Sequence, residues 1–474
     1  MTTQERRLVQ SEIGALKKML ARLPESSVID RMSLEARKRS LERELASQRQ
    51  AGAEEVPPGY KRTEVGVIPE DWEVKPLGML GQFKNGINKD KDDFGHGFPL
   101  VNLMDVFGIP TVTNSVSLGR VNASEVERRT YDLRAGDVLF VRSSVKPEGV
   151  GLTTLITRDL PDTVFSGFLI RYRTNDQLVP EFKEHCFWEG DFRRRLISNS
   201  TVSANTNINQ NVLKTLPLTF PPNKPEQRAI AAALSDADGL IGALDALIAK
   251  KRAIKQAAMQ QLLTGKKRLP GFSGEWEKKR LGEATSIRNQ KVLPSNVDPD
   301  TLCVELEHIG QGDGRLLEVS IAQNSTSSKY RFFTEDVLFG RLRSYLRKFW
   351  YADRDGICTT EIWPLMADAS LIDSRFLYAI VQSDRFIEAA SISYGTHMPR
   401  ADWNVMKNFE IHLPPLPEQT AIAAVLSDMD AEIAALERRR EKAEQIKQGM
   451  IQQLLTGKVR LVESECKGAQ PYAE

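Results

Sequence analysis

The sequence predicts an α+β fold in which two globular domains of mixed α/β structure are each followed by a long helix. Three observations predict it: an internal duplication, a coiled-coil spacing of apolar residues after each globular part, and short strand-like runs mixed with helical stretches inside those parts. We expect the two long helices to form an antiparallel coiled coil that relates the two halves by a pseudo-twofold axis. An extra helical hairpin is expected at the N-terminus.

The duplication is clearest in two short stretches. Residues 225–238 and 417–430 are identical at eleven of fourteen positions, with an offset of 192. The same offset carries residues 260–266 onto 452–458, where all seven positions are identical. Because no insertion or deletion separates the two matches, we expect each copy to be one continuous helix whose length is maintained.

Each copy also has the apolar spacing of a coiled-coil helix. A proline and a glutamate near the start suit the first helical turn, and the glycine of the closing Thr-Gly-Lys can supply a left-handed cap. At 1.5 Å per residue, each helix would be about 55–60 Å long. The apolar positions, alternately four and three residues apart, are Ile230, Leu234, Ala237, Ile241, Leu244 and Ile248, then Ile422, Leu426, Met429, Ile433 and Leu436.

The globular parts repeat more faintly. The stretch that begins at Trp72 resembles the one at Trp276, and residues 137–142 resemble 336–341. Short strand-like runs dominate, for example residues 164–173 and 357–365, and helical stretches such as 180–197 and 374–390 lie among them. Each globular part is therefore predicted to be α+β.

Residues 1–50 stand outside the duplication. One apolar seam precedes a break at Pro24, and a second helix rich in Arg and Glu follows, so a helical hairpin is predicted. It either packs beside the long helices or contacts a partner subunit. Residues 51–59 are predicted to be a linker. The apolar positions of the two helices are Val9, Ile13, Leu16, Leu20 and Leu23, then Leu34, Leu41 and Leu45.

Composition excludes several classes of protein. The net charge of +2 over 474 residues gives no global basic field, so any nucleic-acid binding must come from local patches. The four cysteines lie far apart, which argues against a disulfide framework or a zinc ribbon. We find neither a signal peptide nor an apolar run long enough for a membrane span, and we expect a soluble cytoplasmic protein.

Reaction motifs are hard to find. The sequence has no phosphate-binding loop, no HExxH and no G-x-G-x-x-G after a strand, and its five histidines are scattered. Asp162, Glu181 and Lys183 have nuclease-like spacing and could hold Mg²⁺. The second copy lacks this pattern, and carboxylates near turns are usually solvated, so we predict no catalytic residue and no metal ligand.

The helix motifs and residues 65–74 resemble the specificity subunit of type I restriction–modification systems, over about residues 59–462. The resemblance implies two target recognition domains, each followed by a conserved spacer helix. The domains then divide as follows: 1–50 hairpin, 51–59 linker, 60–222 first target recognition domain, 223–268 first spacer helix, 269–415 second target recognition domain, 416–462 second spacer helix, and 463–474 tail.

The resemblance also implies partners and chemistry. Each domain would read one half of an asymmetric, bipartite site in double-stranded DNA, and the helices would dock two methyltransferase subunits that carry S-adenosylmethionine. Two restriction and translocase subunits, which use ATP and Mg²⁺, would join them. The chain itself would bind no cofactor and catalyse nothing. The alternative is a non-enzymatic scaffold whose two domains bind protein partners.

Candidate DNA-contacting residues lie in polar loops, because base edges are read by Arg, Asn and Gln and phosphates by Lys, Arg and hydroxyls. Arg142 and Arg341 rank highest because they follow the same repeated strand motif. The first domain offers Lys84, Asn85, Lys89, Lys91, Arg142, Ser143, Ser144, Lys146, Asn199, Ser200, Thr201, Asn205 and Asn207. The second offers Arg288, Asn289, Lys291, Arg341, Arg343, Tyr345, Tyr394, Thr396, His397 and Arg400.

A second set of residues is assigned to the helices. The resemblance implies that the repeated helix starts and the apolar seam serve as spacer and as docking surface for the partner subunits. The residues of this set are Pro225, Glu226, Gln227, Ile230, Leu234, Ile241, Pro417, Glu418, Gln419, Ile422, Leu426 and Ile433.

Overall fold

The computed structural model describes Gly14, Lys17, Lys38 and residues 56–202, 205–392 and 399–461. Apart from Gly14, Lys17 and Lys38, the predicted N-terminal hairpin lies outside the described residues, as does the 463–474 tail. The chain divides into two units. The first comprises Met1–Gly239 with Glu444–Glu474, and the second comprises Leu240–Ala443. Each unit therefore holds one globular domain, the beginning of one long helix and the end of the other.

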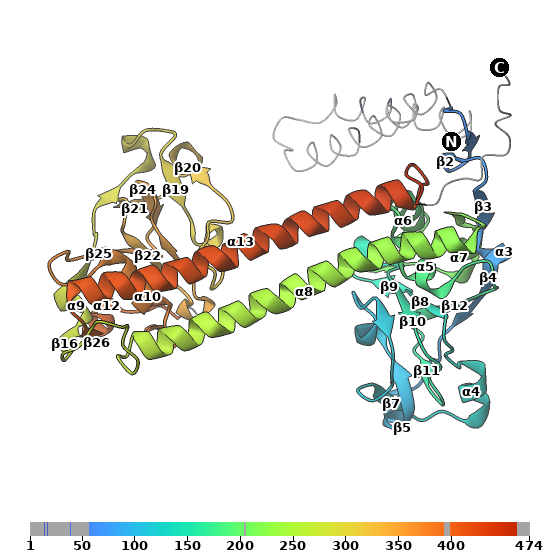
Figure 1. Ribbon diagram of the computed structural model, residues 1–474, viewed down its shortest axis with the longest axis horizontal. Coiled ribbons are helices and arrows are strands. Elements are labelled where there is room, and N and C mark those ends of the chain that lie inside the picture. Colours follow the sequence, from blue (N-terminus) through green and yellow to red (C-terminus); the bar gives the residue numbers. More distant parts are fainter. Residues whose placement is uncertain are drawn as a thin grey trace, which may run out of the picture. The chain divides into compact units, whose positions relative to one another are not determined.

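The first domain is built on a five-stranded sheet, with smaller sheets beside it (Figure 1). The five strands, in spatial order, are β4 (Gly81–Asn85), β12 (Leu169–Thr174), β8 (Val138–Val141), β10 (Thr153–Ile156) and β6 (Thr111–Val112). The three-stranded sheets are β11 (Val164–Phe165), β5 (Phe94–Val101) and β7 (Gly119–Val121), and β13 (Thr201–Val202), β14 (Thr206–Asn207) and β9 (Ser143–Ser144). The pairs are β1 (Tyr60–Thr63) with β2 (Gly66–Pro69), and β15 (Pro217–Phe220) with β3 (Glu73–Pro76).

Short helices complete the first domain. Several begin with side-chain caps, such as Ser124 before α4 and Glu189 before α6, which satisfy free backbone N–H groups. The α-helices are α3 (Leu77–Leu80), α4 (Glu125–Thr130), α5 (Pro180–His185), α6 (Gly190–Ser198) and α7 (Gln210–Thr215). Short 3-10 helices lie at Lys91–Asp93, Leu103–Asp105, Pro147–Gly149 and Cys186–Trp188.

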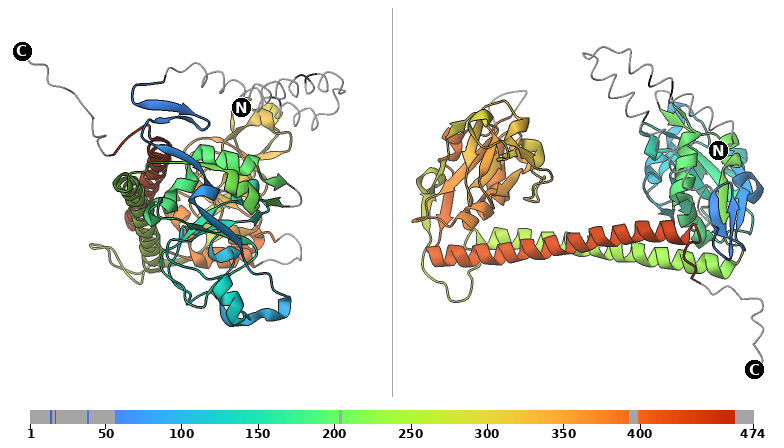
Figure 2. Two further views of the ribbon diagram at one scale, coloured as in Figure 1. Left: turned by 90° about the vertical axis from the view of Figure 1, so that its right-hand side faces the viewer. Right: turned by 90° about the horizontal axis from the view of Figure 1, so that it is seen from above.

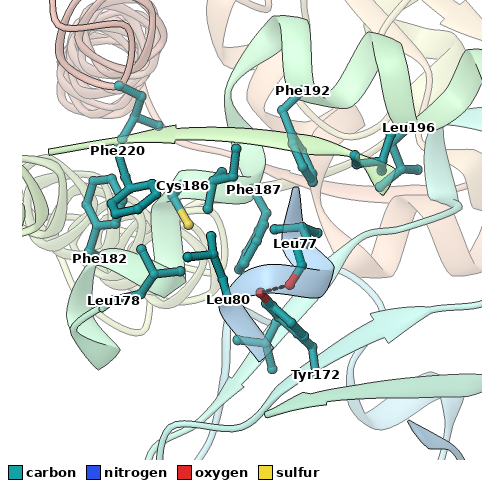
Figure 3. Close-up of a cluster of buried hydrophobic side chains, with 14 of the residues drawn as sticks. Leu77, Leu80, Tyr172, Leu178, Phe182, Cys186, Phe187, Phe192, Leu196 and Phe220 are labelled. Carbon is teal, nitrogen blue, oxygen red and sulfur yellow. Dashed lines mark hydrogen bonds between the residues drawn. The ribbon is translucent and has the colours of Figure 1, made fainter. Parts of the chain in front are cut away.

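An aromatic core holds α5 and α6 against the main sheet. Tyr172 of β12 stacks on Phe83 of β4 with ring centroids 4.3 Å apart, and Phe187 meets Phe140 edge-on at 5.1 Å. The Tyr172 hydroxyl donates a hydrogen bond to the Leu77 carbonyl oxygen, 2.9 Å away, so this buried polar group is satisfied (Figure 3). Fully burying one such aromatic side chain stabilises the fold by roughly 1.5–3 kcal/mol.

The second domain repeats this plan with different sequences. Its first sheet has the order β17 (Thr285–Ile287), β25 (Ile362–Ala367), β22 (Val337–Gly340) and β23 (Phe349–Tyr351). Its second sheet has the order β18 (Lys291–Val292), β21 (Lys329–Phe332), β24 (Gly356–Thr359), β19 (Leu302–Val304) and β20 (Ser320–Ile321), and β16 (Glu277–Arg280) pairs with β26 (Glu410–Leu413). The α-helices are α9 (Leu281–Ala284), α10 (Ser374–Gln382), α11 (Asp384–Ser391) and α12 (Trp403–Met406). Short 3-10 helices lie at Pro294–Asn296, Leu306–His308, Ala322–Asn324 and Ser344–Leu346.

The strand orders show that the duplication extends through the globular domains. The order β4-β12-β8-β10 corresponds to β17-β25-β22-β23, with every neighbouring pair antiparallel. Each domain also contains a corresponding pair of parallel strands, β11 with β5 in the first domain and β24 with β19 in the second. The predicted α+β class is confirmed for both domains, although their sequences have diverged.

The two long helices are α8 (Lys224–Leu262) and α13 (Leu416–Leu454), each of 39 residues. In the second unit, Leu244 and Ile248 of α8 pack against Ile433 and Leu436 of α13. Ion pairs flank these apolar contacts, and their α13 partners have lower numbers as the α8 residues rise, so the two segments run antiparallel within this unit (Figure 2). The pairs are Asp245–Arg440, Arg252–Glu437 and Lys255–Asp430.

Candidate nucleic-acid interface

Backbone hydrogen bonds bring the three predicted polar loops of the first domain to one edge. Strand β14 pairs with β9, and the Ile208 N–H donates to the Arg142 carbonyl oxygen at 2.9 Å. The Arg142 N–H donates to the Phe168 carbonyl oxygen at 2.8 Å, and the Gly167 N–H donates to that of Ile87 at 2.8 Å. Segments 86–88, 142–144, 166–168 and 206–208 therefore lie side by side, and we call them the first rim.

The second domain has the same arrangement. The Arg343 N–H donates to the Pro399 carbonyl oxygen and the Arg341 N–H to that of Glu361, both at 2.8 Å. The Arg288 N–H donates to the Pro364 carbonyl oxygen, also at 2.8 Å. Segments 287–289, 341–343, 359–364 and 399–401 therefore lie side by side, and we call them the second rim.

Each rim contains one segment that the sequence prediction missed. Residues 166–168 join β11 to β12 and residues 360–361 join β24 to β25, and both segments lie between the predicted loops. A side chain at Gly86 would place its Cβ only 2.0 Å from the backbone carbonyl oxygen of Ser166, so the close approach of these two segments requires glycine at position 86. The available signal was a glycine between two apolar strand runs, followed by Phe168, which is 57% exposed.

The basic residues of the first predicted loop have differing environments. Lys89 forms an ion pair with Glu127 at 2.9 Å. The Glu127 carboxylate raises the pKa of Lys89, and the Lys89 ammonium lowers the pKa of the Glu127 carboxyl. The Lys84 ammonium lies 5.4 Å from the centre of the Tyr131 ring. Lys91 is exposed, and Asn85 at the end of β4 is half-buried. Lys91 is thus the basic residue of this loop most accessible to a phosphate.

The second predicted loop of the first domain is only partly accessible. Arg142 is half-buried, and its guanidinium donates to the Gly167 carbonyl oxygen at 3.3 Å. Ser143 is half-buried and Lys146 is exposed. The prediction that Ser144 contacts DNA does not fit its burial, since it lies inside the β9–β14 pairing with 8% exposure.

The third loop divides into capping residues and exposed residues. The Asn199 amide donates to the Arg195 carbonyl oxygen at 2.8 Å, and the Ser200 hydroxyl donates to that of Leu196 at 2.9 Å. Both residues therefore close the C-terminal end of α6, a structural role that the sequence reasoning did not assign. Thr201 and Asn205 are exposed, and the Asn207 amide donates to the Asn205 carbonyl oxygen at 2.9 Å.

Arg288 must be reassigned from a DNA contact to a structural clamp. Its guanidinium binds the Asp336 carboxylate through two hydrogen bonds of 2.7 and 3.0 Å and lies 4.6 Å from the centre of the Phe333 ring. In the first domain Arg173 binds Asp137 in the same way, with both distances 2.7 Å. The aspartate of the repeated Asp-Val-Leu-Phe motif is buried in both domains, so this ion pair fixes the sheet.

The other predicted residues of the second domain mostly lie on or near its rim. The Arg341 guanidinium stacks at 5.6 Å from the Trp363 ring, and its buried Nε has no hydrogen-bond partner among the described residues. Arg343 is exposed, with a left-handed φ of 51°, and Tyr345 is 53% exposed. Arg400 binds Glu361 through both carboxylate oxygens. Asn289 and Lys291 are exposed, whereas Tyr394, Thr396 and His397 lie outside the described residues.

The repeated helix starts are anchored to their own domains. Gln227 receives a hydrogen bond from the Val179 N–H and donates to the carbonyl oxygens of Gln177 and Pro221, all at 2.8 Å. Gln419 repeats this pattern with Asp373, Leu371 and Pro414, at 2.8–2.9 Å. Each amide therefore ties its long helix to the strand and loop that precede it.

The glutamate beside each glutamine is buried against an arginine that lies just beyond the end of the other long helix. Glu418 binds Arg268 at 2.5 and 2.6 Å, and Glu226 binds Arg460, which also pairs with Asp71 at 2.8 Å. The arginine lowers the pKa of the Asp71 carboxyl. We name these contacts the two Glu–Arg clamps.

This burial corrects the docking role that was assigned to the helix residues. A partner subunit cannot touch side chains that are enclosed in the chain's own core. Pro225 and Pro417 are exposed and Ile241 is half-buried, so these three remain accessible. The buried members are Glu226, Gln227, Ile230, Leu234, Glu418, Gln419, Ile422, Leu426 and Ile433.

The residues weighed for a metal-dependent nuclease have other partners. Asp162 forms an ion pair with Arg128. The Lys183 ammonium is buried and donates to the Gly136 carbonyl oxygen and, at 3.0 Å, to the Thr174 hydroxyl. Both side chains therefore serve the local fold. Along the described part of the chain, no helix combines the length and apolarity that crossing a membrane requires.

Comparison with known proteins agrees with this arrangement. A family model described as the type I restriction modification DNA specificity domain matches residues 69–251 and again residues 273–448. The putative type I restriction enzyme MjaX specificity subunit of Methanocaldococcus jannaschii is 26% identical over 448 residues, which cover 85% of this chain and 97% of that protein. The type I restriction enzyme MjaVIII specificity subunit of the same organism is 22% identical over 429 residues, covering 83% and 94%.

A solved structure supports the fold. It comes from a study of complex assembly and conformational transition of the type I R-M system, and it aligns with a TM-score of 0.53 and 18% sequence identity. The alignment covers 83% of this chain and 99% of the solved one. Since the family model matches most of the sequence, in two tandem ranges that each span a domain and much of its helix, the chain belongs to the family of type I restriction–modification specificity subunits.

Proposed function

We propose that this chain is the subunit that chooses the DNA sequence for a type I restriction–modification complex, and that it reads an asymmetric, bipartite site. The observation that carries the proposal is the pair of rims. Both are built from the same strand order, but they present different side chains to solvent. Two rims with the same backbone arrangement but different exposed side chains suit two half-sites that differ in sequence.

The rims carry the chemistry that double-stranded DNA requires. Exposed cations such as Lys91, Lys146 and Arg343 suit phosphate contacts, which set affinity without reading sequence. Amides and hydroxyls such as Asn207 and Ser143 suit base edges. Two modest readers joined in one chain discriminate far better than either alone, because the second contact becomes intramolecular.

The long helices supply the spacer in this proposal. We infer that α8 and α13 form an antiparallel coiled coil with pseudo-twofold symmetry, which the apolar and ionic contacts within the second unit support. Their exposed faces would dock two methyltransferase subunits that carry S-adenosylmethionine. Restriction and translocase subunits would add ATP- and Mg²⁺-dependent chemistry. This chain would itself hold no cofactor and perform no catalysis, and it would act in the cytoplasm.

A selection experiment tests the proposal. The chain, purified with the methyltransferase subunit of the same genome, is mixed with a pool of random DNA duplexes, and bound duplexes are sequenced. We expect enrichment of two short, different motifs at a fixed separation. The alternative, a protein–protein scaffold, predicts no enrichment of any motif at any salt concentration, since any DNA retained would be held through phosphate contacts alone.

A further inference from the structure

We propose that one rim position, Phe168 in the first domain and Glu361 in the second, reads a base pair in each half-site. Phe168 would contact the thymine methyl of an A·T pair. Glu361, together with Arg400, would contact a G·C pair. The inference rests on the proposed function and adds to it the residues that make the two half-sites differ.

The two residues occupy the same place in their domains. Residues 164–169 and 357–362 align without a gap, because Leu169 pairs with Val141 of β8 as Ile362 pairs with Gly340 of β22. One residue earlier, the carbonyl oxygens of Phe168 and Glu361 accept the N–H of the repeated rim arginine, both at 2.8 Å. A difference between these side chains therefore changes the surface while the backbone stays the same.

In the first domain this position is apolar within a polar rim. Phe168 is 57% exposed, and Val145, which directly follows β9, is 82% exposed. Asn207 and Ser143, which pair with each other on β14 and β9, add an amide and a hydroxyl to the same rim. In the major groove such a mixture has a specific complement, since polar groups bind base edges and apolar groups contact the thymine methyl.

In the second domain the same position belongs to an ion pair. The Arg400 guanidinium donates to both Glu361 oxygens, with Nε and Nη2 distances of 2.9–3.1 Å, and 40% of its side chain is exposed. An exposed pair of this kind contributes little to stability. Its donors and acceptors are held side by side, and they match a G·C pair, where arginine binds guanine O6 and N7 and glutamate accepts from the cytosine amine.

The first experiment compares selected motifs. The complex with the methyltransferase subunit is selected on random duplexes with the wild-type chain, with Phe168→Ala and with Glu361→Gln. We expect Phe168→Ala to lower the preference at one A·T position of one half-site about fourfold, the equivalent of about 0.8 kcal/mol for one methyl-sized contact. We expect Glu361→Gln to lower the preference at one G·C position of the other half-site about fivefold or more. In each case the unaltered half-site is the internal reference.

A second experiment removes the base group instead of the side chain. In a duplex that carries the selected site, the relevant thymine is replaced by uracil, or the relevant cytosine by an analogue without the 4-amino group. Each replacement should weaken binding by the wild-type chain and have little further effect on the matching variant. Independent, additive losses would show that the residue and the base group do not touch.

Two matched variants control for surface changes. Phe94→Ala removes another exposed phenylalanine of the first domain, outside its rim, and Asp353→Asn breaks another exposed ion pair of the second domain. Neither should change the motif. If the wild-type complex selects a two-part motif that Phe168→Ala and Glu361→Gln leave unaltered, this inference fails and the proposed function stands. If the wild-type complex selects no motif, the proposed function itself fails.

Discussion

At the residue scale, the residues that are identical in the two copies of the helix start make contacts within this chain. The Glu and Gln of both helix starts are buried; the Gln partners lie in the adjacent domain, and each Glu binds an arginine just beyond the end of the other long helix. Because these residues are identical in the two copies, the sequence predicts that they form a docking surface for partner subunits. The burial shows instead that an internal contact, made twice, is sufficient to explain the identity.

The Glu–Arg clamp of the second unit gives a direct prediction. Arg268→Met leaves the Glu418 carboxylate buried without its cation, and breaking a buried pair in this way costs about 3–5 kcal/mol. We expect urea unfolding of the second unit to shift to lower concentration by the corresponding amount. The double variant Arg268→Met, Glu418→Leu should recover much of the loss, because an apolar pair can replace a buried ion pair.

A matched control for this prediction lies on the surface of the same domain. Arg354→Met removes an ion pair with Asp353 in which both side chains are more than half exposed, and it should cost at most about 1 kcal/mol. Equal losses for Arg268→Met and Arg354→Met would contradict the assigned importance of burial.

A buried histidine predicts an acid-sensitive first unit. Burial lowers the pKa of His185 to about 4. Two charged groups also act on the ring: Asp238 favours its charged form, and Lys447 opposes it. The ring Nε2 lies 3.1 Å from the Ser235 hydroxyl of α8. The unfolded chain binds this proton below about pH 6.5 and the folded chain only near pH 4, so stability present above pH 6.5 is lost as the pH falls to 4.

The expected loss is about 3 kcal/mol over this pH window, from the difference in pKa. Hydrogen exchange of α5 amides, followed from pH 7 to pH 4, measures it locally after correction for intrinsic exchange rates. The variant His185→Gln, which cannot be protonated in this range, should show a flatter dependence. The same slope in both proteins would rule out His185 as the cause.

The rim residues show which parts of a site can be predicted from sequence. Loops rich in Asn, Ser and Lys were found by composition, and most of these residues do lie on or near the rims. Arg288 was misassigned because its partner Asp336 is 48 residues away in sequence. Phe168 and Glu361 were missed because each lies within a predicted strand-like run, and only the pairing of the strands shows that these residues lie on the rims; the one local signal was the glycine before Phe168.

At the scale of elements, the helices were predictable and the sheets were not. A helix closes its hydrogen bonds locally, so the spacing of apolar residues is enough to indicate α8 and α13. Strand partners are distant in sequence, as with β4 and β12, which are more than 80 residues apart. The order of strands therefore follows from packing that no local pattern encodes.

The length of the two helices gives an element-scale prediction. Inserting seven residues into α8 after Gly239 and seven into α13 after Ala443 keeps the heptad seam and lengthens each helix by about 10 Å. We expect the spacer of the selected DNA site to grow by up to about three base pairs, at 3.4 Å per step, with both half-sites unaltered. Sequencing of selected duplexes measures the spacer. An unchanged spacer would show that the helices do not set the distance.

At the scale of the whole molecule, the two units combine the same parts in different chain order. Each has a domain, the start of one long helix and the end of the other, joined by a Glu–Arg clamp. The second unit, Leu240–Ala443, is one continuous stretch of chain. The first combines residues up to Gly239 with residues from Glu444 onwards, so its parts are separated by the entire second unit.

The Glu226–Arg460 clamp has a consequence for synthesis on the ribosome. The first domain emerges first, yet its core includes Ile451 and Leu454 of α13, which are synthesised near the end of the chain. Its buried Glu226 likewise has no Arg460 partner until that residue has been made. The second unit has all its residues by Ala443 and can close while the chain is still being made. The domain that is translated first is therefore the one completed last, and until then its exposed core surface is a natural target for chaperones.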